Sequence, residues 1–400
     1  MTLPPTLRSL QIRNYRLWFT GQVISVAGTW TQTIAQAILV LHLSHNNGVA
    51  AGASVAVQYL PTLLFGIWGG LLADRVDKRK LLMKTQAVLA LFAFLLGVLD
   101  LSGTITLASV FVLIGCSGCA TAIDQPTRQS FVPELVNKEH LANAIGLNST
   151  IFNGARIVGP AIAAGVIYVS STGVCFLINA LSYVAILIAL RKMRPAELHR
   201  ATRLVRAKGQ VREGISYAWS QPQLRSNLLL MTMVGTFAFN FSVVLPLLAK
   251  VTFHGGSGTV SLVFIVQGIG ALAGALLIAS LRRTDGRRLI VATALLGLAM
   301  CAAAAAPTIT PFLVLMPIVG VGQIFTASSS NSMIQFDSDP SMRGRVTSLR
   351  TLTVLGSTPI GGLIAGGIAQ AANPRWALAV GGVGCFAGVG LGRSLLDGTH

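Results

Sequence analysis

Charge is scarce in this sequence: Asp, Glu, Lys and Arg make up 10% of its 400 residues, and only 12 residues are acidic. So low a charge excludes a disordered chain. With 53% hydrophobic residues and a mean hydropathy of +0.70, it also excludes an ordinary soluble domain. The composition therefore predicts an all-α polytopic membrane protein.

The residue patterns of several enzyme classes are missing as well. The sequence has no P-loop, so it does not encode an ATPase, and it has nothing that resembles a hydrolase triad. Cys116 and Cys119 have the spacing of a redox or metal pair, but they lie in an apolar run without histidines at ligand spacing. We therefore predict no enzymatic activity, no metal and no cofactor.

Long apolar runs account for most of the chain. A bilayer core takes roughly 20 apolar residues per helix, so the sequence has room for about twelve spans. The predicted spans of the first half are 16–41, 51–73, 81–101, 105–125, 141–169 and 173–191. Those of the second half are 224–250, 257–281, 288–306, 309–333, 343–370 and 375–393.

Polar residues are concentrated between the two halves. We predict two six-helix bundles, 1–191 and 224–400, joined by a cytoplasmic linker over 192–223. Within the linker, residues 211–219 carry apolar side chains at helical spacing, which predicts a short helix on the membrane surface.

The basic residues predict the orientation. When the N-terminus is placed in the cytoplasm, all 30 Lys and Arg fall in cytoplasmic segments except Lys250, Arg375 and Arg156, the last within a span. We therefore expect a multi-pass protein of the cell membrane with both termini in the cytoplasm. The net charge of +18 then belongs to loops beside anionic lipids of the bilayer, and no nucleic-acid partner is predicted.

An internal repeat favours a transporter. Gly159-Pro160 in the fifth span has a counterpart in Thr358-Pro359 in the eleventh. Two six-helix pseudo-repeats are the simplest explanation. In such proteins the substrate site lies between the halves near the midplane, and access alternates as one half rocks against the other.

A charged cluster at residues 69–80 interrupts the apolar runs after the second span. Gly70 would let two helices approach closely, and Asp74 would face the positive N-terminus of another helix. Basic side chains of the cluster would pair with acids or cap helix C-termini. We predict a conformational gate, against the alternative of a plain topology signal, made of Gly70, Asp74, Arg75, Asp77, Lys78 and Arg79.

The cluster resembles the signature of the major facilitator superfamily between spans two and three, with Asp77 in place of the usual glycine. This variant is similar to the branch that contains the enterobactin exporter and macrolide efflux proteins. The stretches 124–128, 131–136 and 141–144 resemble the same branch. The resemblance implies the twelve-helix fold of two pseudo-repeats and a transporter that works as a monomer.

The fifth span is similar to the glycine-proline motif of the superfamily's antiporters, which implies export coupled to an inward ion flow, most simply of protons. The motif residues are Gly154, Arg156, Gly159, Pro160 and Gly165. The small residues of the motif would permit tight contact with the eighth span, at Gly268, Gly270 and Gly274. Arg156 would either meet an anionic substrate or hydrogen-bond a neighbouring helix near Pro160.

Polar and aromatic residues within the spans are candidates for the substrate pathway, although each could instead form an interhelical hydrogen bond. The candidates are Gln32, Gln36, Gln58, Tyr59, Asn153, Phe237, Asn240, Phe241, Gln267, Gln323 and Asn331. An apolar pocket with a few amides and aromatics suits amphipathic molecules. No acid at the midplane identifies the proton carrier, because Asp124 is expected to pair with Arg128 or a loop arginine.

These observations lead to a secondary transporter that exports a hydrophobic or amphipathic small molecule, either a drug-like compound or a siderophore, by proton antiport. Two alternatives stay open. The protein could be an importer or facilitator of a small metabolite, or the membrane subunit of a larger complex. His42 and His45, in the first outer loop, could also sense pH.

Overall fold

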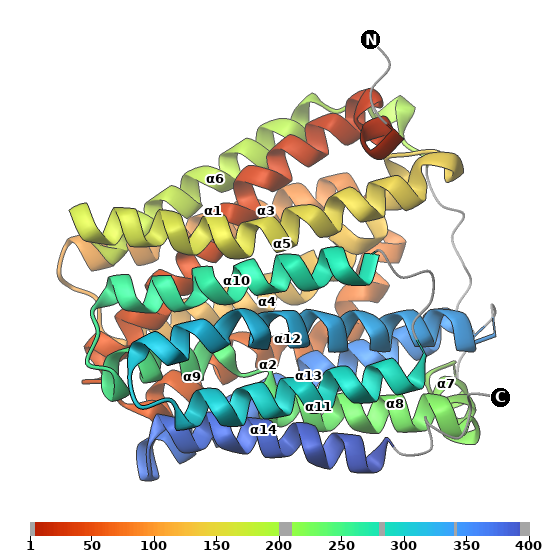
Figure 1. The fold of residues 1–400 in the computed structure, drawn as a ribbon. Helices are drawn as coiled ribbons and strands as arrows, with labels where there is room; N and C mark the ends of the chain where they lie inside the picture. Colours follow the sequence, from red (N-terminus) through yellow and green to blue (C-terminus); the bar gives the residue numbers. More distant parts are fainter. Residues whose placement is uncertain (1–4, 200–209, 280–284, 340–341, 393–400) are drawn as a thin grey trace. The chain divides into compact units, whose positions relative to one another are not determined.

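The computed structural model describes residues 5–199, 210–279, 285–339 and 342–392 (Figure 1). Up to residue 199 its helices are η1 (Pro5–Gln11), α1 (Arg13–Leu43), α2 (Gly48–Arg75), α3 (Lys78–Leu101), α4 (Leu107–Phe131), η2 (Val132–Glu134), α5 (Lys138–Val169), α6 (Thr172–Lys192) and η3 (Pro195–Glu197). From residue 210 they are α7 (Gln210–Ser220), α8 (Pro222–Met233), η4 (Val234–Ala238), α9 (Phe241–Leu247), η5 (Leu248–Thr252), α10 (Ser257–Ala279), α11 (Gly286–Ala305), α12 (Ile309–Asp337), α13 (Arg343–Ala371) and α14 (Pro374–Leu391).

In the described ranges, 12 helical segments are long and apolar enough to cross a membrane, which confirms the predicted all-α membrane class. Each predicted span coincides with one of them. The seventh span, Pro222–Thr252, is the irregular one, because it consists of α8, η4, α9 and η5 in succession. The helix predicted over 211–219 is α7, and the arginines of the linker between 200 and 209 lie outside the described residues.

The chain forms two compact units, and each of them is made of two segments that are separated in the sequence. Unit 1 comprises residues 1–39 and 60–204, and unit 2 comprises residues 40–59 and 205–400. The turn between α1 and α2 belongs to unit 2 because the first half of α2 packs on α13. The division into 1–191, 192–223 and 224–400 remains a prediction.

Glycines make this packing of α2 on α13 possible. A Cβ added at Gly52 would lie closer than 3.0 Å to the backbone oxygen of Gly362, and one at Gly366 would lie equally close to the oxygen of Gly48. The Gly48 amide also donates a hydrogen bond of 2.7 Å to Oε1 of Gln370. The two backbones therefore meet with no side chain between them.

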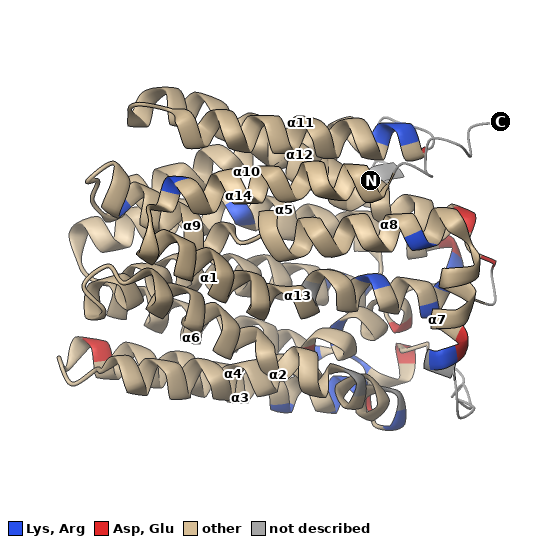
Figure 2. Ribbon diagram, turned by 90° about the horizontal axis from the view of Figure 1, so that it is seen from below, with Lys and Arg blue, Asp and Glu red and all other residues tan. Residues whose placement is uncertain are grey.

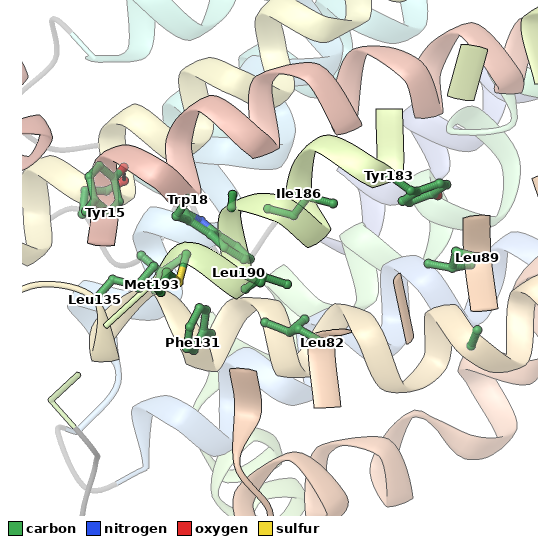
Figure 3. Packing of buried hydrophobic residues seen from close by; sticks show 14 of the residues in the cluster. Tyr15, Trp18, Leu82, Leu89, Phe131, Leu135, Tyr183, Ile186, Leu190 and Met193 are labelled. Carbon is green, nitrogen blue, oxygen red and sulfur yellow. Dashed lines mark hydrogen bonds between the residues drawn. The ribbon is translucent and has the colours of Figure 1, made fainter. Parts of the chain in front are cut away.

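Unit 1 has an aromatic and aliphatic core near the start of α1 (Figure 3). Trp18 is 1% exposed, and its ring lies edge-on to the ring of Phe131 at 5.3 Å. The Tyr15 hydroxyl donates a 2.8 Å hydrogen bond to the Ala144 carbonyl, so α1 is tied to α5. This core fixes α1, α3, α4, α5 and α6 around the charged cluster described below.

Unit 2 relies on small residues where its helices cross. Cβ atoms added at Gly270 or Gly320 would collide with the backbones of Pro317 and Gln267, so α10 and α12 are in backbone contact. Such close contact is how membrane helices gain packing energy in the absence of a hydrophobic driving force.

Most Lys and Arg residues lie near one end of the helices that carry them (Figure 2). We call this the basic end of each unit. In unit 2 it includes the start of α8, α11 and α13, whereas Lys250 and Arg375 lie at the opposite end.

Candidate functional site

The charged cluster between α2 and α3 is anchored within unit 1. The side chain of Asp77 accepts a hydrogen bond of 3.1 Å from the Lys80 amide, so this residue is the N-cap of α3. An aspartate at the N-cap satisfies an unpaired amide and favours the helix dipole. The residue that departs from the superfamily pattern therefore has a local structural reason.

The basic residues of the cluster have the two kinds of partner expected from the sequence. Lys78 forms an ion pair with Glu134, and their side chains are only 11% and 9% exposed. Arg79 donates from Nε to the Leu190 carbonyl at 2.6 Å, at the C-terminal end of α6. Their predicted role in gating is not tested by these contacts.

Gly70 of the cluster lacks the close helix contact that was predicted for it. A Cβ at Gly70 would have its nearest neighbour, in Pro126, 4.0 Å away, so the predicted close approach at Gly70 is wrong. The close approach occurs one residue earlier, because a Cβ at Gly69 would collide with the Ala122 carbonyl of α4. The side chain of Asp74 lies outside the described part of the structure, and Arg75 is exposed.

In the antiporter-like motif, Gly159 is the glycine in close contact. A Cβ there would collide with Trp30 of α1, and the Thr31 hydroxyl donates a 3.2 Å hydrogen bond to the Gly159 carbonyl. The Arg156 guanidinium lies 5.4 Å from the centre of the Trp30 ring, which favours its contact with a neighbouring helix. An anionic substrate group remains the alternative partner.

The other small residues of the predicted contact with the eighth span lie in different surroundings. Cβ atoms added at Gly154 or Gly165 would have no neighbour within 4 Å. In α10, Gly270 and Gly274 have their closest neighbours in α12. The close approaches of Gly159 and Gly270 are thus made within their own units.

Several pathway candidates have hydrogen-bond partners in their own unit. Oε1 of Gln32 accepts a hydrogen bond of 2.6 Å from Asn179, and Asn153 donates to a backbone oxygen of its own helix. Nε2 of Gln267 in α10 donates a hydrogen bond of 3.4 Å to Oε1 of Gln323 in α12, so the structure brings these two candidates together. Of the remaining candidates, Gln36 is buried. The side chains of Gln58, Tyr59 and Asn331 are partly buried.

The seventh span is broken at Asn240, between the π-helical segment η4 and α9. Nδ2 of Asn240 donates to the Thr236 carbonyl at 2.6 Å, while its Oδ1 is buried and has no hydrogen-bond partner among the described residues. Phe237 lies in η4 and the buried Phe241 begins α9. Broken helices with π turns are typical of substrate sites in transporters, because they free backbone and side-chain polar groups.

A second polar cluster lies in unit 1 around Asp124 of α4, which is 2% exposed. Its carboxylate forms an ion pair with Arg128 at 2.5 Å, which confirms the predicted pairing. It also accepts hydrogen bonds from Thr85 Oγ1 at 2.7 Å and from Gln86 Nε2 at 2.8 Å, both on α3. Arg128 in turn donates to Gln22 of α1 at 3.3 Å.

The Asp124 cluster is incompletely paired. Nε of Arg128, Oε1 of Gln86 and Nε2 of Gln22 are buried and have no hydrogen-bond partner in the described chain. Each such atom costs about 1–3 kcal/mol, so three in one cluster indicate a place where bonds rearrange or water enters. Gln22, Thr85 and Gln86 were not predicted as site residues, although polar residues inside apolar spans were a usable signal.

The arrangement offers the parts that a secondary transporter needs. It has a buried carboxylate beside a cation in one unit and, in the other, a broken helix with a buried amide oxygen that has no hydrogen-bond partner among the described residues. Within the described residues, no group of three or more His, Cys, Asp and Glu side chains is placed to hold a metal ion.

Comparisons with known proteins agree with this fold. The structure is similar to a POT family transporter in complex with 5-aminolevulinic acid, with a TM-score of 0.76, 11% identity and 96% coverage of both chains. It also resembles a bacterial homologue of the iron transporter ferroportin, with a TM-score of 0.70, 16% identity, and coverage of 96% of this chain and 98% of that one. At these identities the likeness shows the fold, which is that of a major facilitator transporter.

Sequence comparison gives the family. Residues 5–395 match the family described as "Transmembrane secretion effector", and the chain belongs to it. The staphyloferrin A transporter of Staphylococcus aureus is 27% identical over 66% of each chain. Macrolide efflux protein A of Streptococcus pyogenes is 23% identical over 88% of each, and the multidrug efflux pump Tap of Mycolicibacterium fortuitum 27% over 87%. The protein is therefore a multi-pass membrane transporter of the major facilitator superfamily and not an enzyme.

Proposed function

We propose that this protein exports a hydrophobic or amphipathic small molecule, a drug-like compound or a siderophore, in exchange for protons. The chain acts as a monomer in the cell membrane, and the basic end of each unit faces the cytoplasm, as do both termini of the chain. The relatives named for macrolide efflux, multidrug efflux and staphyloferrin A transport support this substrate class. Movement of the two units opens the substrate site to one side of the membrane at a time, and the charged cluster at 69–80 is part of the gate.

The observation that carries the proton-coupling proposal is the Asp124 cluster. A proton antiporter requires a membrane-embedded group that is ionised in one state and neutral in another. Asp124 is nearly fully buried. Among its described contacts, Arg128 is the one cation, and Thr85 and Gln86 are neutral. If Arg128 turns away, the isolated buried carboxylate is stabilised by taking up a proton. The unpaired atoms of Gln22 and Gln86 give Arg128 and water alternative partners.

The break in the seventh span supports an amphipathic substrate. Phe237 and Phe241 offer apolar contact on either side of Asn240, whose Oδ1 is free to accept a hydrogen bond. A few polar groups within an apolar surface are typical of sites for drug-sized molecules. We assign substrate binding to this break and proton exchange to Asp124.

Transport into everted membrane vesicles tests both parts. We expect radiolabelled erythromycin, a macrolide, or an amphipathic dye such as ethidium to accumulate when the vesicle interior is acidic. In Asp124→Asn, accumulation driven by the gradient should fall by about tenfold or more, while exchange of labelled for unlabelled substrate continues. Asp100→Asn is the matched control, because Asp100 is paired with Thr172 at the opposite end of α3.

The outcomes separate the alternatives. Accumulation in Asp124→Asn equal to that of the unmodified protein would remove Asp124 from proton coupling. Transport that ignores the gradient would favour an importer or facilitator. Failure of the purified protein to transport any probe after reconstitution alone, in contrast to activity in native membranes, would favour a subunit of a larger complex.

A further inference from the structure

A separate cavity lies in unit 2 at the end opposite to the basic end. It has a volume of about 670 Å³ and is lined by the last turn of α1 with the residues that follow it, and by η5 with the turn that follows it. All of its lining residues belong to unit 2. Cavities of roughly 300–1,000 Å³ are typical of sites for small molecules.

The lining of the cavity is basic. It contains Lys250, His42, His45 and His254, and it contains no acidic residue. The acids described in unit 2, at positions 213, 285, 337 and 339, lie in α7, beside the start of α11 and at the end of α12, which are all at the basic end. The positive charge of the cavity is therefore not offset locally.

Lys250 is unusual for its position. Among the described residues of unit 2, the charged ones at this end are Lys250 and Arg375. Arg375 is held by contacts within the unit. Arg375 donates to the carbonyls of Ala304 and Ala306 at the end of α11 and lies 5.2 Å from the Phe253 ring. Lys250 is half-buried and makes no ion pair with the described residues. Its charge thus remains available to a ligand.

The two turns that carry His45 and His254 are closed and held in an uncommon conformation, whereas His42 lies in the last turn of α1. His45, Asn46 and His254 have φ angles of 53°, 61° and 52°, in the left-handed region. Histidine and asparagine enter this region more readily than most residues, but it still costs free energy. Backbone hydrogen bonds from Asn46 to Leu41 at 2.7 Å and from Gly255 to Ala249 at 2.8 Å close the turns. The histidines are therefore presented by ordered backbone.

We propose that this cavity binds a small anion that carries carboxylate or phosphate groups, with the Lys250 ammonium as its main partner. The three histidines act as hydrogen-bond donors to the anion. The charged and titratable groups around them are Lys250 and, beyond Phe253, Arg375, all of them cationic. Anion binding is independent of what the transporter exports.

Calorimetric titration of the purified full-length protein in phosphatidylcholine nanodiscs tests this proposal, with citrate and inorganic phosphate as probes. We expect saturable binding of both probes. Lys250→Gln should weaken binding by about tenfold, whereas Lys250→Arg should retain it. Arg343→Gln is the matched control, because it removes the same charge from an exposed residue at the basic end, and its affinity should stay within about twofold.

The source of the anion is resolved by a second set of nanodiscs that contain phosphatidylglycerol. Loss of citrate binding in those discs identifies a lipid headgroup as the occupant, and retained binding identifies a dissolved anion. No binding of either probe in phosphatidylcholine discs would overturn the proposal. Equal binding by Lys250→Gln and the unmodified protein would also overturn it, provided that both unfold at the same temperature.

Discussion

The ion pair between Lys78 and Glu134 provides a quantitative test of how the charged cluster works. Its two side chains are 11% and 9% exposed, and it joins the start of α3 to η2 after α4. Removing one partner of a buried pair leaves an uncompensated charge and costs about 3–5 kcal/mol. Replacing both partners with apolar residues of similar size is often neutral. We expect Lys78→Met and Glu134→Met each to lower the free energy of unfolding by about 3 kcal/mol, at the lower end because some solvent reaches the pair.

The double variant Lys78→Met/Glu134→Met should lose less than either single variant, that is less than about 3 kcal/mol, so the coupling energy of the pair should exceed about 3 kcal/mol. The measurement is reversible unfolding in detergent micelles, followed by circular dichroism. The exposed pair of Arg194 and Glu197, with side chains 64% and 44% exposed, is the matched control in the same unit. The corresponding Met variants there should change stability by less than about 1 kcal/mol.

Additive losses at Lys78 and Glu134, within about 0.5 kcal/mol, would refute the reasoning. The same variants also distinguish structure from gating. If the pair only holds α3 in place, the double variant should recover transport together with stability. If Lys78 exchanges partners during the cycle, transport should stay impaired although stability returns.

Two further predictions use neighbouring glycines as their own controls. Gly366→Ala should lower stability by about 1–3 kcal/mol and reduce transport, because its Cβ would collide with the Gly48 carbonyl, whereas Gly367→Ala, with no neighbour within 4 Å, should be tolerated. In α5, Gly159→Ala should destabilise unit 1 by a similar amount through its contact with Trp30 and Gly165→Ala should not. Equal melting temperatures within either pair would contradict these contacts.

Much of the fold could be predicted from the sequence. The number of spans followed from apolar length, because bilayer thickness sets a fixed requirement for each helix. The partners of Asp124 and Arg79 were predicted in kind, since buried charges need an opposite charge or a helix end. The short helix α7 was visible from the spacing of its apolar side chains.

Other features were beyond the sequence. It gave no sign that Gly69, and not Gly70, meets α4, because a helix that is apolar on all sides does not reveal its rotation. Nor did it indicate the break at Asn240, since hydropathy is the same for an α-helix and a π-helix. The polar cluster around Asp124 comes from three helices, α1, α3 and α4, and which of their faces meet depends on helix rotation.

The sequence by itself determined the class of this protein, the number of its spans and the uneven placement of its charges. These properties depend on local hydrophobicity and charge, which each segment carries independently of its neighbours. Only the tertiary structure decided which charges pair, which glycines touch, and that the first half of α2 packs with the second half of the chain. Those choices depend on shape and hydrogen bonding between distant residues, because lipid and protein interiors are equally apolar and hydropathy alone cannot rank the possible helix contacts.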